Sequence, residues 1–179
     1  GALAAVGLGD GRGLAARYGA LGAALGHELI RALDDSAAAW PAADRAQLAT
    51  RTACVADQYA TFEALPRQLV SGPRTARAAV ADLGGARVAL DAYRAARARA
   101  GAGPTADGLD DEQQFFVGLA QAACSRERAD ELARRLAVDP RAPSKFRVYG
   151  ALRNLPAFAT AFRCAPGTPM RPAQVCSVW

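Results

Sequence analysis

The sequence predicts a single domain built mainly from α-helices. Its 179 residues lie within the size range of one domain, and 51% of them are hydrophobic, enough to bury a core. Much of that hydrophobic fraction is alanine, the strongest helix former, and the chain contains neither an internal repeat nor a low-complexity linker. Arginine is the main basic residue and Lys145 is the only lysine, as expected of a high-GC bacterial gene. We therefore expect residues 1–179 to form one helical unit.

The chain begins with a glycine-rich entry loop and two predicted helices. Residues 1–13 are expected to be a flexible loop, because no strand precedes the glycines as it would in a phosphate-binding loop. A helix is predicted over residues 14–33, and Trp40-Pro41 predicts the start of the next one, since proline suits the first helical position. The apolar residues of this second helix recur at helical spacing and are expected to face the core, namely Leu48, Val55, Tyr59 and Phe62.

Prolines and glycines interrupt the pattern between residues 65 and 72, and a long helix is predicted over residues 73–98. Gly84 and Gly85 lie inside it, although each costs a helix about 1 kcal/mol relative to alanine. Their presence predicts that another backbone packs close, as it would where this helix crosses the helix of residues 14–33.

Shorter helices are expected in the remainder of the chain. Asp110 and Gln113 have the spacing of a capping box, which predicts that a helix starts there and carries Phe115 and Phe116 inward. Further helices are predicted over residues 126–137 and 156–162, whereas residues 144–154 are ambiguous between helix and extended chain.

The net charge of +5 does not indicate a nucleic-acid-binding protein. The densest basic cluster, Arg94, Arg97 and Arg99, falls at a predicted helix C-terminus, where cations interact favourably with the helix dipole. Neither interleaved aromatic residues nor a nucleic-acid-binding motif accompanies it. No run of about eighteen apolar residues occurs, so we expect no membrane span. The first residues lack a methionine and a basic segment, and they are interpreted as an internal cut rather than a signal peptide.

Residues 26–35 contain a zinc-binding motif that has lost a ligand. In the pattern H-E-x-x-H, two histidines one helical turn apart bind zinc, and the glutamate activates the zinc-bound water. His27 and Glu28 match this pattern, but Arg31 occupies the position of the second histidine. A guanidinium stays protonated and offers no lone pair to a metal, so a fixed positive charge has replaced a ligand.

Other segments accompany this motif in a fixed order. They are the small, apolar stretch of residues 18–25, Ala-Asp-Leu-Gly-Gly at 81–85, Phe-Arg-Val-Tyr-Gly at 146–150, and the terminal Cys-Ser-Val-Trp at 176–179. With these segments the chain resembles the neprilysin-type zinc metallopeptidases from Tyr18 to its last residue. The resemblance implies the C-terminal helical part of a zincin-like peptidase domain, without the N-terminal lobe of the family.

The same resemblance implies a role for each matching position. His27 and Glu28 match the first zinc ligand and the general base. The third ligand, a glutamate four residues before Asp82, is replaced by Ala78, and Arg141 stands where the family has its transition-state histidine. The positions that keep the family's residues are Asp34 and Asp82, the acids that support the ligand histidines, and Arg147, which contacts substrate.

We therefore expect no zinc and no other cofactor, because one imidazole cannot replace the three or four protein ligands of a zinc site. Without the metal, water beside Glu28 is not activated, so Glu28 is interpreted as a vestigial base and the chain as a pseudopeptidase. We hypothesise that Arg31 lies in or near the vacated cavity and pairs with Glu28, Asp34 or Asp82. The alternative is that Arg31 turns to solvent.

The four cysteines match oxidised cysteines of the family, which favours a secreted, periplasmic or other cell-envelope protein. The resemblance implies a disulfide between Cys54 and Cys176. It places the partners of Cys124 and Cys164 in an N-terminal portion that this chain does not contain. These two are expected to bond to another chain, although a bond between them or free thiols remain alternatives.

Three interpretations of function remain. The first is a non-catalytic domain that stabilises a companion polypeptide supplying the N-terminal lobe, or that holds a peptide in the cleft through Arg147. The second is a repurposed, metal-free enzyme that uses Glu28, Asp82 and the cleft arginines on an anionic substrate. The third and least favoured is an active zinc metalloendopeptidase completed by another chain, because the ligand positions belong to a single pair of helices.

Overall fold

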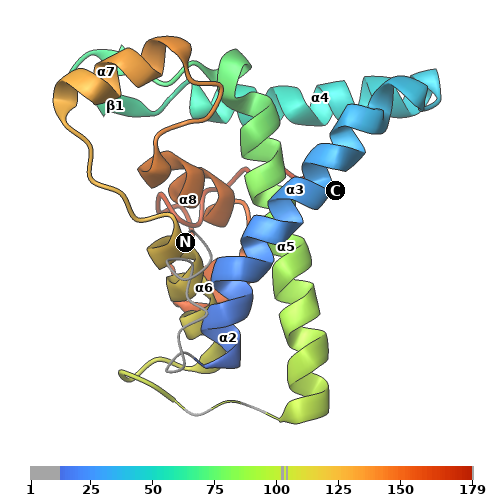
Figure 1. The fold of residues 1–179 in the computed structure, drawn as a ribbon, viewed down its shortest axis with the longest axis vertical. Helices are drawn as coiled ribbons and strands as arrows, with labels where there is room; N and C mark the ends of the chain where they lie inside the picture. The colour runs from blue at the N-terminus through green and yellow to red at the C-terminus, as the bar shows by residue number, and fades with distance from the viewer. Residues whose placement is uncertain (1–12, 102, 104, 179) are drawn as a thin grey trace.

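The computed structural model describes residues 13–101, 103 and 105–178. In this range the chain is mainly helical, with one two-stranded sheet, which confirms the predicted fold class. Figure 1 shows helices that cross one another at steep angles rather than a parallel bundle. The expected entry loop lies outside the described residues except for Gly13. Among the helices that are described, none is both long and apolar enough to cross a membrane.

The first helical segment runs without a break from Leu14 to Asp35. It consists of α2 (Leu14–Arg17), a π-helical turn η1 (Tyr18–Gly22) and α3 (Ala23–Asp35), and the short 3-10 helix η2 (Ser36–Ala39) follows it. The helix predicted over residues 14–33 is therefore confirmed. The sequence pattern gave no sign of the π-helical turn, which lies beside the cavity described below.

The long helix α5 (Gly72–Ala100) crosses α3 at a pair of glycines. A Cβ atom on Gly26 of α3 would lie 2.6 Å from the carbonyl oxygen of Gly85, and a Cβ on Gly85 would lie 2.8 Å from the carbonyl carbon of Gly26. Side chains at either position would push the two backbones apart. The close approach predicted from Gly84-Gly85 is thus confirmed, and Figure 1 shows α3 crossing in front of α5.

Helix α4 (Ala42–Tyr59) follows Pro41, as predicted, and packs on α5. Its residues Val55 and Tyr59 are fully buried, and Phe62 just beyond it is also buried. The chain then forms a small antiparallel hairpin, β1 (Glu63–Leu65) and β2 (Gln68–Leu69). The sequence pattern did not predict these strands, because three and two residues are too few to show alternation.

Helix α6 (Asp111–Ala122) begins with the predicted capping box. The Asp110 side chain accepts a hydrogen bond from the Gln113 backbone N–H, and the Gln113 side chain accepts one from the Asp110 N–H. Two ion pairs join this end of α6 to α5, Arg94 with Glu112 and Arg97 with Asp111, each at 2.7 Å. These two arginines of the basic cluster are therefore used within the fold.

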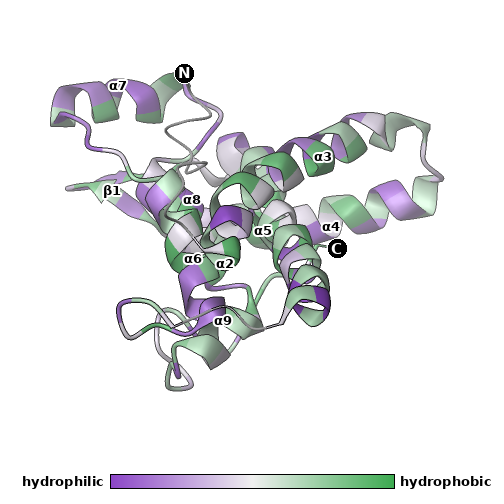
Figure 2. Ribbon diagram, turned by 60° about the horizontal axis from the view of Figure 1, so that its bottom comes forward, coloured by the Kyte–Doolittle hydropathy of each residue, from purple (hydrophilic) through white to green (hydrophobic). Residues whose placement is uncertain are grey.

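Three short helices complete the structure, α7 (Ala129–Val138), α8 (Ser144–Leu152) and α9 (Pro156–Ala161). The ambiguous segment of residues 144–154 is therefore helical over most of its length. Helix α7 lies at the periphery near β1 in both ribbon views, and most of it is coloured as hydrophilic in Figure 2. Arg74 of α5 donates a hydrogen bond of 2.8 Å to the Leu136 carbonyl and links α7 to the main body.

The core lies where α4, α5, α6 and α8 meet. Most of its largest fully buried side chains are aromatic. Contacts between these rings join helices from both halves of the sequence. Ring centroids 5 to 6 Å apart connect one set formed by Tyr59, Phe62, Phe146 and Tyr149 and another formed by Tyr93, Phe115, Phe116 and Phe158.

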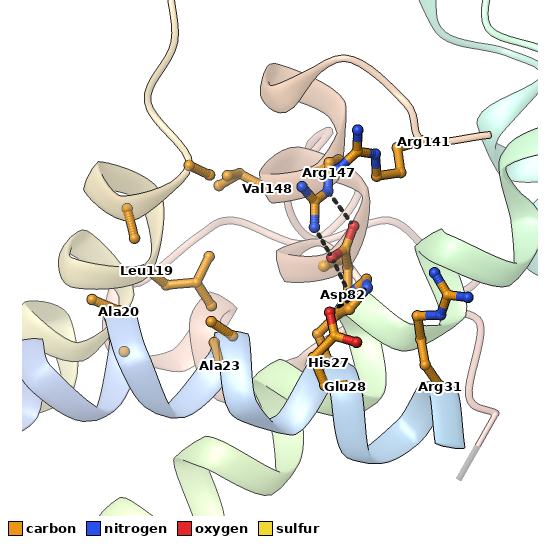
Figure 3. Close-up of a pocket in the computed structure, with 15 residues that line it drawn as sticks. Ala20, Ala23, His27, Glu28, Arg31, Asp82, Leu119, Arg141, Arg147 and Val148 are labelled. Carbon is orange, nitrogen blue, oxygen red and sulfur yellow. Dashed lines mark hydrogen bonds and ion pairs between the residues drawn. The ribbon is translucent and has the colours of Figure 1, made fainter. Parts of the chain in front are cut away.

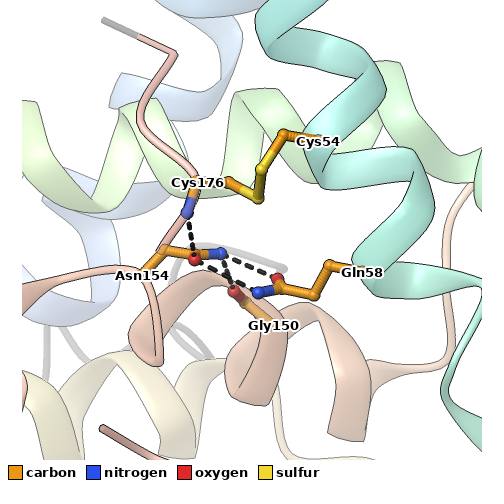
Figure 4. The surroundings of a disulfide bond; sticks show 5 residues. All are labelled: Cys54, Gln58, Gly150, Asn154 and Cys176. Atoms are coloured by element: carbon orange, nitrogen blue, oxygen red, sulfur yellow. Dashed lines mark hydrogen bonds between the residues drawn. A yellow bond between two sulfur atoms is a disulfide. The ribbon is translucent and has the colours of Figure 1, made fainter. Parts of the chain in front are cut away.

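A disulfide joins Cys54 of α4 to Cys176 near the C-terminus, as the resemblance implied. Figure 4 shows Asn154 beside it, where its side-chain oxygen accepts a hydrogen bond of 2.8 Å from the Cys176 backbone N–H. Asn154 also exchanges hydrogen bonds with Gln58 of α4. The C-terminal segment is thus held to α4 covalently and to α8 by a buried amide.

Candidate functional site

A cavity of about 310 Å³ opens between η1, α3, α5, α6 and α8. The first half of α3 and the π-helical turn form its floor, and α6 and α8 form two walls, as Figure 3 shows. One part of the lining is made of small or apolar side chains, and the other is charged. The charged part contains His27, Glu28, Arg31, Asp82, Arg141 and Arg147, which are six of the seven site residues predicted from the sequence.

His27, Asp82 and Arg147 form a continuous chain of contacts across three helices (Figure 3). His27 Nδ1 of α3 lies 2.8 Å from Asp82 Oδ1 of α5, and Arg147 of α8 donates hydrogen bonds of 2.7 and 2.9 Å to the two carboxylate oxygens. Because a carboxylate accepts hydrogen bonds, the contact orients the ring of His27 with Nδ1–H as the donor to Asp82. The same hydrogen bonds, and then the charge of Asp82, raise the pKa of Arg147 despite partial burial.

Glu28 follows His27 on α3 and also lines the cavity, but its side chain is largely exposed. Its carboxylate lies 4.0 Å from His27 Nε2, and its side chain is 75% exposed. A carboxylate so exposed is hydrated, so its geometry alone gives no sign of an activated base.

Tyr59 lies behind the charged part of the cavity. Its hydroxyl is buried and, within the described chain, has no hydrogen-bond partner. Burial, and next the negative charge of Asp82, raise the pKa of Tyr59 far above its usual range. The phenol therefore stays neutral near pH 7.

Arg31 lines the cavity, as hypothesised, but the expected ion pairs are wrong. Within the described residues its guanidinium makes no hydrogen bond or ion pair, and the residue is exposed. Asp34 lies outside the cavity and binds Arg77 of α5 at 2.7 Å, while Asp82 binds Arg147. Arginines from other helices neutralise these two carboxylates, so Arg31 is not required to balance their charge. The assignment of Asp34 to the cleft is corrected accordingly.

Arg141 lies at the edge of the cavity and is held by Asp139. Its backbone N–H and its Nε donate hydrogen bonds of 2.9 and 3.2 Å to Asp139 Oδ1, and Arg135 of α7 binds the other carboxylate oxygen. Burial acts to raise the pKa of Asp139, but the hydrogen bonds from Arg141 and Arg135 outweigh it and lower the pKa to about 2. Arg141 is thus positioned rather than free.

The donor groups of this cavity do not fit a zinc ion. Zinc sites in proteins supply three or four His, Cys, Asp or Glu ligands, and no group of three such side chains is placed to hold a metal in the parts of the chain that are described. Ala78 lies one turn before Asp82 and is buried, so its methyl group offers no ligand. His27 Nε2 could bind a metal, but Arg31 places a guanidinium one turn further along α3.

The sequence pattern does not indicate that the apolar half of the cavity belongs to a site. Its residues come from η1, α3, α6 and α8 and were expected only as core or motif positions, among them Ala20, Ala23, Leu119 and Val148. The one available signal was the unusually small, apolar stretch that precedes His27. Only the packing of α6 and α8 against it reveals a common cavity.

A His-Glu helix that crosses an Asp-bearing helix, with an arginine from a third, is the arrangement expected of a neprilysin-type domain. The comparisons with known proteins agree: the chain belongs to peptidase family M13, which it matches over residues 12–178. The described helices are consistent with a part of such a domain.

Relatives and solved structures extend over nearly the whole chain. It is 35% identical over 178 residues to human endothelin-converting enzyme 1, covering 92% of this chain and 23% of that protein. It is 36% identical to an endothelin-converting enzyme homolog of Locusta migratoria, with 90% and 24% covered. The zinc metalloprotease ZMP1 of Mycobacterium tuberculosis in complex with an inhibitor superposes with a TM-score of 0.83 at 34% identity, covering 92% of this chain and 28% of that one. The chain thus spans about a quarter of the length of these relatives.

Proposed function

We propose that this chain is a catalytically impaired M13 domain that acts by binding, holding a partner chain or a peptide instead of cutting one. The observation that carries the proposal is the pair of substitutions at Arg31 and Ala78. Each removes a donor from a site that needs at least three. The chain of contacts from His27 through Asp82 to Arg147 supports a cleft whose shape is kept by protein groups alone.

Zinc content and peptidase activity test this proposal together. After incubation with zinc and dialysis, the chain should retain well below one equivalent of metal by mass spectrometry and should leave a quenched fluorescent peptide uncut. The double variant Arg31→His with Ala78→Glu restores an imidazole and a carboxylate and should retain about one equivalent. The variant Arg126→His, at an exposed position away from the cavity, is the control and should not. One equivalent in the wild-type chain, lost together with peptidase activity on chelation, would contradict the proposal.

The exposed side of α3 supports the proposal of a companion polypeptide that supplies the N-terminal lobe. Leu25, Leu29 and Leu33 recur every four residues and are 58%, 64% and 41% exposed. None of them lines the cavity. Burying a leucine side chain contributes about 1.5–3 kcal/mol of free energy. A partner that covered all three leucines would therefore bind more favourably.

The mass of the intact, non-reduced protein isolated from its source tests the companion chain. Cys124 is exposed and Cys164 half-buried, and neither is bonded within the described chain. We expect a disulfide-linked species that separates into two polypeptides on reduction. Leu29→Lys should weaken any association that survives reduction, whereas Val138→Lys, on the exposed end of α7, should not. Free thiols on both cysteines in a monodisperse monomer would count against a linked companion.

The Cys54–Cys176 disulfide supports a location outside the cytosol, in the cell envelope or secreted, because such bonds persist in oxidising compartments. Fractionation of the source cells tests this, with the protein expected outside the cytosolic fraction. A cytosolic protein with both cysteines reduced would overturn it.

A second candidate function is metal-free chemistry on an anionic substrate. Three arginines line the cavity, Arg31, Arg141 and Arg147, and guanidinium groups suit carboxylates and phosphates. If this candidate is correct, the protein turns over an anionic substrate, and Glu28→Gln abolishes that turnover. Binding without turnover would favour the non-catalytic function.

A further inference from the structure

We propose that the cavity binds a small monoanion, a carboxylate attached to a short apolar group, and that Arg31 is the residue that binds the carboxylate. The inference rests on the proposed function, because it needs a cavity whose floor is not occupied by zinc. Arg31, which stands where the family has its second metal ligand, would then take part in ligand binding.

The first step is the distribution of charge among the cavity arginines. Arg147 uses its Nε and one terminal nitrogen on Asp82, and Arg141 is bonded to Asp139. Arg31 has no such partner within the described part of the chain, although it lines the same cavity. Its planar group presents parallel N–H donors that match the two oxygens of a carboxylate. Arg31 is therefore the cavity arginine that is not paired with a carboxylate within the described chain, so all of its donors are available.

The second step concerns the charge of the ligand. The lining carries three guanidinium groups and the carboxylates of Glu28 and Asp82, and Asp139 neutralises Arg141 from outside it. After these pairings little positive charge is left beyond that of Arg31, so the site suits one negative charge better than two. Glu28 lies three residues from Arg31 without pairing with it, and it opposes the anion by like-charge repulsion.

The third step concerns the apolar half of the cavity. Ala20 and Ala23 form the floor, and Leu119 and Val148 face each other from α6 and α8, as Figure 3 shows. Small side chains on the floor leave space above them. At about 310 Å³ the cavity lies at the lower end of the range of about 300–1,000 Å³ for small-molecule sites. This half suits a short alkyl or similarly compact group, whose carboxylate would lie at the charged end of the cavity with Arg31.

Hexanoate is a suitable probe, with binding followed by isothermal titration calorimetry on the full chain. Hexanoate should bind, and hexylammonium and hexanol, which lack the anion, should not. Acetate, which lacks the apolar group, and inorganic phosphate should each bind at least about tenfold more weakly, since a charge-assisted contact and a buried alkyl chain each contribute about this factor. Equal binding of hexylammonium or phosphate would overturn the assignment of a monoanion.

Variants assign the anion to Arg31. Arg31→Gln should weaken hexanoate binding by about tenfold or more, and Arg126→Gln, an exposed arginine outside the cavity, should leave it unchanged. Glu28→Gln should strengthen binding, and added salt should weaken it in the wild-type chain. Val148→Asn should weaken hexanoate but not acetate. Arg31 is exposed, so its variant should melt at the wild-type temperature, and unchanged hexanoate binding by such a folded variant would disprove the role of Arg31.

The zinc content of the same samples distinguishes failure of the proposed function from failure of anion binding by Arg31. Hexanoate binding that disappears on chelation of a bound zinc ion would contradict the proposed function as well as this inference. Zinc-free protein that does not bind hexanoate, or that binds it independently of Arg31, would contradict this inference alone.

Discussion

His27 Nδ1 and Asp82 Oδ1 lie 2.8 Å apart, although 55 residues separate them in the sequence. Their contact depends on the crossing of α3 and α5, where the backbones touch at Gly26 and Gly85. Because His27 follows Gly26 directly and Asp82 lies almost one turn before Gly85, the crossing point brings the two side chains together. The geometry of the cavity is therefore set by two residues that have no side chains.

The first prediction is that Gly85→Ala destabilises the protein. A Cβ at this position would lie 2.8 Å from the carbonyl carbon of Gly26 and closer still to the His27 nitrogen. Both neighbours are backbone atoms, so the helices must separate at a cost of about 1–3 kcal/mol. Urea denaturation measures this as a lower midpoint. Gly103→Ala, where a Cβ would meet nothing within 4 Å, is the matched control, and equal midpoints for the two variants would show that the crossing tolerates a side chain.

The second prediction is that Asp82→Asn costs about 2 kcal/mol of stability, since it leaves Arg147 with a neutral acceptor in a largely buried position. The Asp82 side chain is 12% exposed, and it accepts from both His27 and Arg147. Chemical denaturation checks the loss, with the exposed Asp57→Asn as control. A double-mutant cycle with Arg147→Gln should show coupling between the two sites. Purely additive losses would mean that the ion pair contributes nothing.

Local sequence signals predicted the elements of this fold well. The capping box of Asp110 and Gln113 and the helix-starting Pro41 are short-range features, so their effect can be read from neighbouring residues. The crossing of α3 and α5 was also predictable, because two adjacent glycines inside a helix need a compensating contact. The hairpin of β1 and β2 was not, because its strands are shorter than one full alternation of side chains.

The partners of charged residues were harder to predict. Spacing along α3 suggested that Arg31 could pair with Glu28 or Asp34, but it carries no information about arginines from other helices. Arg77 reaches Asp34 from α5, and Arg147 reaches Asp82 across 65 residues of sequence. Ion pairs at such separations depend on how the helices pack, which a single sequence does not specify.

The third prediction concerns the Cys54–Cys176 disulfide, which closes a loop with a sequence separation of 122. The chain-entropy relation gives a stabilisation of about 4–5 kcal/mol for a loop of this length. Cys176→Ser should therefore lower the free energy of unfolding by roughly that amount in denaturant titrations. Cys124→Ser, at an exposed thiol without a bond in the described chain, should leave it within about 0.5 kcal/mol. A small and equal effect of both variants would indicate that the bond constrains the unfolded chain little.

The fourth prediction is a dependence of stability on pH below 4 that comes from Asp139. Its pKa is lowered from an ordinary value of 3.8 to about 2 in the folded protein, so the folded state binds the proton less readily than the unfolded state does. The stabilisation is present above the unfolded pKa and is lost as the pH falls through the folded pKa.

Melting temperatures of the wild-type chain and of Asp139→Asn, measured from pH 6 to pH 2, test this directly. The wild type should be more stable than the variant by a constant margin above about pH 5, and the margin should shrink towards zero near pH 2. Asp130→Asn is a suitable control, because the Asp130 side chain is 75% exposed in the first turn of α7. A margin that stays constant down to pH 2 would mean that Arg135 and Arg141 do not hold Asp139 in its charged form. In that case the edge of the cavity would lack the anchor that positions Arg141.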